Sequence, residues 1–130
     1  MKNRIRRAKR LLRVQSKLLL TERLELESVR GELAQAREEE QKAIALLNEE
    51  APPEVPPSFL VRRAAASAVK IKNWEGLLET QVEITLDHAR REQLVKKKLE
   101  SETENFSRNE QKIALQAMID AYLSSSLKQD

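Results

Sequence analysis

All four prolines of this chain lie within one octapeptide, residues 51–58, which reads Ala-Pro-Pro-Glu-Val-Pro-Pro-Ser. A proline inside a helix removes one backbone hydrogen bond and clashes with the preceding turn, so no helix is expected to pass through this segment. About fifty residues before it and seventy after it contain no comparable breaker. We therefore predict an all-α fold with helices over about 3–50 and 59–127 and a turn at 51–58. The two helices are expected to form one antiparallel coiled-coil hairpin, a single domain over 1–130 with the C-terminal helix longer.

The composition favours long helices over a globular core. Charged residues make up 35% of the 130 residues and hydrophobic residues 40%, but aromatic residues only 3%. The commonest residues, among them Leu, Ala, Glu, Lys, Arg and Gln, are good helix formers.

An apolar series recurs every seven residues in both helices. Such a repeat keeps one narrow stripe on the same side of a helix, which then supercoils against a partner. In the first helix the series is Ile5, Leu12, Leu19, Leu26, Leu33, Glu40 and Leu47, with Ala8, Gln15, Glu22, Val29, Ala36 and Ala43 three places on. In the second it is Ala64, Ile71, Leu78, Thr85, Glu92, Leu99, Phe106 and Ile113, flanked by Val82, Ala89, Val95 and Ala117. The polar residues around Thr85–Glu92 weaken the second stripe.

A turn centred on residues 54–55 pairs residues whose numbers sum to about 109. Trp74 then faces Gln35, among the small residues Gly31, Ala34 and Ala36, as packing of a large side chain against small ones requires. Gly31 and Gly76, the only glycines, are expected at nearly the same height.

The same pairing leaves residues 109–127 without a partner in the hairpin. This segment carries large apolar residues, among them Ile113, Leu115, Met118, Ile119, Tyr122 and Leu123. An isolated helix of this length is marginal in water, so we expect the segment to contact another protein.

The N-terminal segment is strongly basic. Eight positive charges precede the first acidic residue: Lys2, Arg4, Arg6, Arg7, Lys9, Arg10, Arg13 and Lys17. The register sets them beside residues 92–107, which begin with the run Lys96-Lys97-Lys98. This indicates a docking surface for an acidic partner or for phosphates, although a merely solvated helix end has the same composition.

The basic start followed by heptad leucines superficially resembles a basic-region leucine zipper. The basic stretch is too short to cross a major groove, and Gln15 and Glu22 make the zipper core polar. Nucleic-acid binding is therefore the less favoured alternative.

We find no candidate for catalysis, a cofactor or a metal. The chain has no cysteine, and His88 is its only histidine. Asp87 and Glu92 are the residues nearest to completing a ligand set with it, but the spacing fits no recognised metal site, and we interpret His88 as solvated. No stretch approaches the roughly 18 apolar residues of a membrane span. The basic start leaves a mitochondrial presequence as an alternative, against which the unbroken heptads argue.

Apolar residues also cluster on both sides of the proline turn: Ile44, Leu46 and Leu47 before it, and Phe59, Leu60 and Val61 after it. They cannot all face a two-helix seam. They either close the turn or form an exposed tip for a partner.

The whole architecture resembles the FliJ family of flagellar export proteins and its YscO-like relatives in type III secretion. The residues that carry the resemblance are the opening Met1-Lys2-Asn3-Arg4, Trp74, and Asn109-Glu110-Gln111-Lys112 ahead of Ile119-Asp120. The chain departs from the family in its dense proline cluster and in having no second aromatic residue beside Trp74.

The resemblance implies a non-enzymatic cytoplasmic stalk, peripheral to the inner-membrane export apparatus. Its partners would be the export ATPase ring, the export gate protein and export chaperones, with no small-molecule substrate. The residues expected at the ATPase are Arg4, Arg7, Arg10, Arg13, Met118 and Tyr122. Those expected at the gate or chaperones are Leu47, Phe59 and Leu60. The alternative function is a general coiled-coil scaffold.

Overall fold

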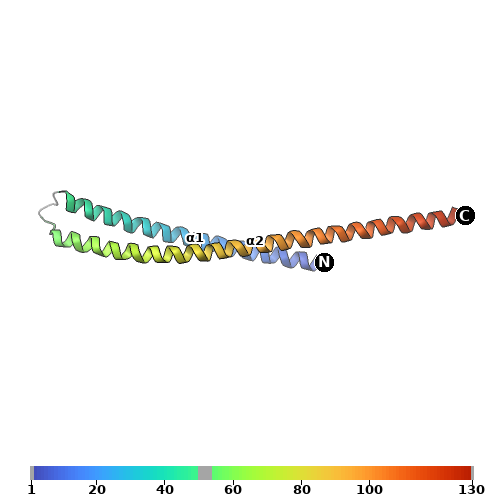
Figure 1. Ribbon diagram of the computed structural model, residues 1–130, viewed down its shortest axis with the longest axis horizontal. Coiled ribbons are helices and arrows are strands. Elements are labelled where there is room, and N and C mark those ends of the chain that lie inside the picture. The colour runs from blue at the N-terminus through green and yellow to red at the C-terminus, as the bar shows by residue number, and fades with distance from the viewer. Residues whose placement is uncertain (1, 50–53, 130) are drawn as a thin grey trace. The chain divides into compact units, whose positions relative to one another are not determined.

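The computed structural model describes residues 2–49 and 54–129, with the side chains of 128 and 129 outside the description. It is all-α, as the heptads predict: α1 spans Lys2–Asn48 and α2 spans Pro57–Gln129, and the two pack against each other (Figure 1). The C-terminal helix is the longer one, as expected. The chain divides into two compact units, and the division falls inside both helices. Unit 1 comprises residues 1–16 and 90–130, and unit 2 comprises residues 17–89.

The ends of the helices at the turn follow from local chemistry. The amide of Glu49 donates to the carbonyl of Ala45, which adds one helical bond after α1. Pro57 occupies the first position of α2, where its missing amide hydrogen costs no helical bond. The amide of Phe59 donates to the carbonyl of Pro56. The second helix therefore starts two residues earlier than predicted, and residues 50–53 of the predicted turn lie outside the described part.

In unit 2, residues 17–48 of α1 pack antiparallel against residues 57–89 of α2 (Figure 1). We letter the heptads a to g, with a at Leu19 in α1 and at Ala64 in α2. The buried residues of α1 in this unit all fall on a or d: Leu19, Val29, Leu33, Ala36 and Ala43. The apolar stripe predicted for the first helix is thus confirmed.

Two ion pairs between the helices of unit 2 match an antiparallel arrangement. Arg37 pairs with Glu75 at 3.3 Å, and both occupy e positions. Lys70 pairs with Glu39 at 4.0 Å, and both occupy g positions. Pairing of e with e and g with g is the pattern of antiparallel strands in a coiled coil, because like edges then face each other.

The stripe of α2 that faces the seam differs from the prediction. Its a series is as expected, but its d series in unit 2 consists of Leu60, Ser67, Trp74, Gln81 and His88, all buried or half-buried. Val82 and Ala89, predicted to flank the a series, lie one position further round the helix at e and are half-buried. The seam-facing side of α2 is therefore more polar than the apolar seven-residue series predicted.

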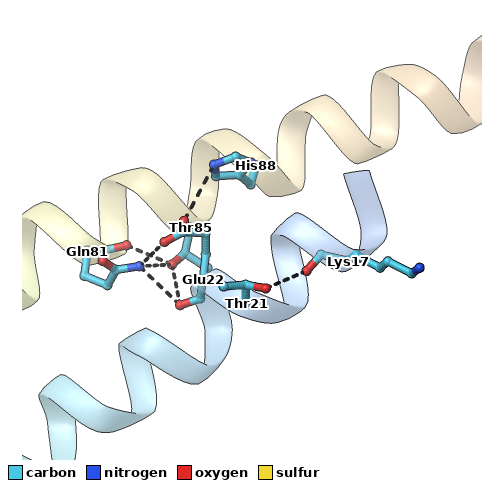
Figure 2. A network of polar contacts seen from close by, with 6 residues as sticks. All are labelled: Lys17, Thr21, Glu22, Gln81, Thr85 and His88. Atoms are coloured by element: carbon cyan, nitrogen blue, oxygen red, sulfur yellow. Dashed lines mark hydrogen bonds and ion pairs between the residues drawn. The ribbon is translucent and has the colours of Figure 1, made fainter. Parts of the chain in front are cut away.

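A polar layer in unit 2 joins Glu22 of α1 to Gln81, Thr85 and His88 of α2 (Figure 2). The Nε2 of Gln81 donates to the Glu22 carboxylate at 2.6 Å and to the Glu22 carbonyl at 3.2 Å. The Thr85 hydroxyl donates to the carbonyl of Gln81 at 2.8 Å and lies 3.4 Å from the carbonyl of Glu22. The Nε2 of His88 lies 4.0 Å from Oε1 of Glu22. Because polar groups withdrawn from water need such partners, the layer favours one alignment of the helices over others.

Trp74 lies where the register predicts, beside Gln35 and Ala36 in a shallow depression that Glu32, Glu39 and Lys70 complete. The glycines have a different role from the predicted one. Both are exposed, and a Cβ built on Gly31 or Gly76 meets no atom within 4 Å, so neither makes room for a neighbour.

Replacing both glycines with alanine should therefore stabilise unit 2. Neither has a positive φ, and alanine lowers the backbone entropy of the unfolded chain. Each substitution is expected to raise the free energy of unfolding by about 0.5–1 kcal/mol. Urea titration followed by Trp74 fluorescence measures this, since the single tryptophan belongs to unit 2. A loss of stability would mean that the backbone at one of them is close-packed.

In unit 1, residues 2–16 of α1 pack against residues 90–106 of α2. The α1 side of this seam has Ile5, Ala8, Leu12 and Gln15 buried or half-buried; the α2 side has Glu92, Val95, Leu99, Glu102 and Phe106 half-buried. From 107 to 127 every residue of α2 is exposed, which confirms the expected unpaired segment, Ile113 and Ala117 included (Figure 1).

Candidate partner-binding surface

The charges at the basic start of α1 are not balanced within the helix that carries them. The first turn contains no acidic residue, although the N-terminal end of a helix dipole favours negative charge. Within the described residues, no ion pair joins the cations from Lys2 to Lys17 to a carboxylate. Their mutual repulsion and the dipole both disfavour this helix end, so an anionic partner would stabilise it.

The structure separates the four arginines that the sequence grouped together. Arg4 and Arg7 line a groove of about 480 Å³ with Lys98 and Glu102, over a floor that includes Ala8 and Leu11. Arg10 and Arg13, with Arg6 and Lys9, line a second, more polar depression. Successive residues three apart shift by about 60° around a helix, so Arg4 and Arg13 lie on opposite sides of α1.

Both helices of unit 1 line the groove, as the predicted register requires. Arg4, Leu11 and Lys98 all occupy g positions, and g edges face each other in an antiparallel pair. Three cations and one carboxylate around an apolar floor can hold an anionic group and bury apolar side chains next to it. That combination suits a protein segment better than a free phosphate, which needs no apolar floor.

Met118 and Tyr122, which the resemblance assigned to the ATPase, are both exposed to solvent. Met118 is 70% exposed and Tyr122 is 75% exposed, both in the part of unit 1 that has no seam partner. Large exposed apolar side chains in a continuous helical segment mark an interaction surface more than they stabilise the chain.

The turn end of unit 2 is divided between core and surface. Leu60 is only 2% exposed and belongs to the seam, so the structure does not offer it to a partner, contrary to the expectation. Leu47 is half-buried at an a position. Phe59 is 52% exposed, and Ile44, Leu46 and Val61 are exposed as well. The expectation that these six residues cannot all face the seam is confirmed.

The polar layer of unit 2 places two titratable residues, Glu22 and His88, opposite each other across the seam. His88 is not solvated as predicted; its side chain is 16% exposed and faces Glu22. Its Nδ1 is buried without a hydrogen-bond partner. No group of three or more His, Cys, Asp or Glu residues in the described part of the chain is arranged to hold a metal ion. Sequence reasoning missed this layer, though the polar residues at Glu22 and Thr85 on heptad positions signalled it.

No helix among the described residues combines the length and apolarity needed to cross a membrane. No protein-family model, curated protein or solved structure matches this chain.

Proposed function

We propose that this protein is a non-enzymatic stalk of a flagellar or related type III export apparatus. Unit 1 would bind the export ATPase ring, and the turn end of unit 2 would contact the export gate or export chaperones. The observation that carries the proposal is the set of unpaired cations at the N-terminal end of α1, beside an exposed apolar segment of α2. The proposal places the protein in the cytoplasm, at the membrane only through its partners.

Two features support a binding role over chemistry. The exposed side chains of unit 1 offer charge and apolar area on rigid helices, which is what recognition of a protein surface needs. The titratable residues of the polar layer in unit 2 are engaged with one another across the seam. The resemblance of the opening residues, Trp74 and the 109–120 segment to the FliJ family selects the export apparatus among assemblies that use such a stalk.

Reversing the charges of Arg4, Arg7 and Arg10 together should weaken binding to the export ATPase on the order of 100-fold, because three attractive contacts become repulsive. Helicity by circular dichroism should not fall, since glutamate near a helix N-terminus is favoured by the dipole. The matched control reverses Arg62, Arg63 and Lys72, three exposed cations of unit 2. Unchanged ATPase binding in the first variant would refute the proposal.

The second candidate function is a coiled-coil scaffold, and the exposed apolar residues after 107 favour it. Sedimentation of the full chain and of a truncation after Arg108 separates the two. A scaffold loses its oligomers on truncation, whereas a stalk has the same state of association with and without the segment.

A further inference from the structure

One edge of unit 2 carries carboxylates that pair with no cation of the described residues. Glu39 and Lys70 both occupy g positions and pair at 4.0 Å, which gives the register between the g positions of the two helices. Glu32 and Glu25 occupy the g positions one and two heptads before Glu39. Both are exposed, and neither takes part in an ion pair within the described part of the chain. This edge therefore has two negative charges available to a partner.

The α2 side of the same edge is apolar. In an antiparallel pair, one heptad back along α1 corresponds to one heptad forward along α2, so the register sets Leu77 beside Glu32 and Ile84 beside Glu25. Leu77 and Ile84 are both exposed. We call these four residues the acidic edge of unit 2. Carboxylates beside exposed apolar side chains fit a partner that presents cations around an apolar surface.

The other edge of unit 2 does not attract such a partner. The e positions of α1 in this unit carry Arg23, Arg30 and Arg37. Arg30 pairs with Glu27 and Arg37 with Glu75, which leaves the positive charge of Arg23 unbalanced by an ion pair within the described residues. A cationic partner is therefore directed to the acidic edge.

The groove of unit 1 is a surface of that kind. Its lining residues are Arg4, Arg7, Ala8, Leu11, Lys98 and Glu102. The groove and the acidic edge both include residues of α1, and side chains of one helix contact each other only at spacings of three or four residues. A single chain therefore cannot bring Arg4 to Glu25 or Glu32, but a second copy can.

We infer that the groove of unit 1 binds the acidic edge of unit 2 in a second copy of this chain. The cations of the groove pair with Glu25 and Glu32, and Leu77 and Ile84 pack against the apolar floor. Two copies related by a two-fold axis make this contact twice, so one dimer satisfies both surfaces of both chains. A foreign acidic helix in the groove would leave the acidic edge without a partner, whereas the second copy covers both.

This dimer goes beyond the proposed function and does not rest on it. It covers Arg4 and Arg7, which the proposed function assigns to the export ATPase. The second copy and the ATPase would therefore compete for the groove, and the dimer would be a form of the protein that does not bind the ATPase.

Exchanging charges on the full chain tests the inference by sedimentation equilibrium at about 50 mM salt, where ion pairs are weakly screened. Arg4→Glu with Arg7→Glu should raise the dissociation constant of the dimer about tenfold or more, because like charges then meet in both contacts. Glu25→Lys with Glu32→Lys, in a separate variant, should do the same. An equimolar mixture of the two variants should dimerise within about threefold of the unaltered chain, because each contact of the mixed dimer again joins opposite charges.

Two control variants make the same charge changes elsewhere. Arg6→Glu with Arg13→Glu alters the second depression of α1, and Glu79→Lys with Glu83→Lys alters exposed residues of unit 2 outside the g positions. Each should change the dissociation constant less than about threefold, because only distant, screened charges change. Circular dichroism of every variant shows whether a lost dimer reflects lost helicity.

Three results would overturn the inference: an unaltered chain that is monomeric at about 500 μM, control variants that weaken the dimer as much as the test variants, and a mixture that does not recover. A dimer that Ile119→Ser with Tyr122→Ser dissociates would overturn it as well, because association would then depend on the segment after 107. If the dimer forms as expected but the export ATPase is not bound, the inference stands and the proposed function fails. If the ATPase is bound by a chain that stays monomeric, the proposed function stands and the inference fails.

Discussion

Leu19→Asp should lower the free energy of unfolding of unit 2 by about 3–5 kcal/mol, close to the whole stability of a small unit. Leu19 is 2% exposed at an a position, so the substitution places a carboxylate in the apolar seam and leaves a cavity. Urea unfolding followed by Trp74 fluorescence measures the loss, since both residues belong to unit 2.

The neighbouring residue provides the control. Leu20 is 57% exposed, so Leu20→Asp should cost only about 0.5 kcal/mol, the difference in helix propensity. Equal losses for the two variants would show that the seam of α1 is rotated from the position described above.

Replacing Glu22 and Gln81 together with leucine should stabilise unit 2 and reduce its specificity. Exchanging both partners of a hydrogen bond in the seam for packed apolar side chains is nearly neutral or stabilising, here by on the order of 1 kcal/mol. A gain of 1 kcal/mol corresponds to roughly 4–8 °C in melting temperature for a unit of this size. With leucine at both positions, pairing with other helices or in other alignments no longer leaves a polar group without a partner. The weight-average mass in sedimentation should therefore rise with concentration more than it does for the unaltered chain.

The single variant Gln81→Leu separates specificity from simple hydrophobic gain. It removes the amide that donates to the Glu22 carboxylate at 2.6 Å, so it should destabilise unit 2 by about 1–3 kcal/mol. If Glu22→Leu with Gln81→Leu has the same weight-average mass in sedimentation as the unaltered chain at every concentration, the polar layer does not decide which helices pair.

The first heptad stripe shows how far local patterns predict this fold. The positions from Ile5 to Leu47 were identified from spacing alone, and the structure buries or half-buries every one of them. The second stripe was only half predicted. Val82 and Ala89 are apolar and follow the polar residues Gln81 and His88, but the polar pair faces the seam. An apolar count cannot detect this, because the reward for burying Gln81 is a hydrogen bond to a residue 59 positions away.

The candidate binding surface was also predicted only in part. The basic character of residues 2–17 and the unpaired segment after 107 were both predicted from charge and register. The separation of Arg4 and Arg7 from Arg13 depends on where the second helix lies, and so does the loss of Leu60 to the seam. Its neighbour Phe59 differs by only one position, yet remains 52% exposed.

The sequence by itself determined the two helices, their unequal lengths, the place of the turn and the direction of pairing. Those features depend on local hydrogen bonds, on the geometry of proline and on a seven-residue period. Only the tertiary structure decided which side of α2 enters the seam and which cations share the groove with Lys98. Adjacent residues differ by about 100° around a helix, so these outcomes depend on the partner helix and not on the residue's own sequence neighbours.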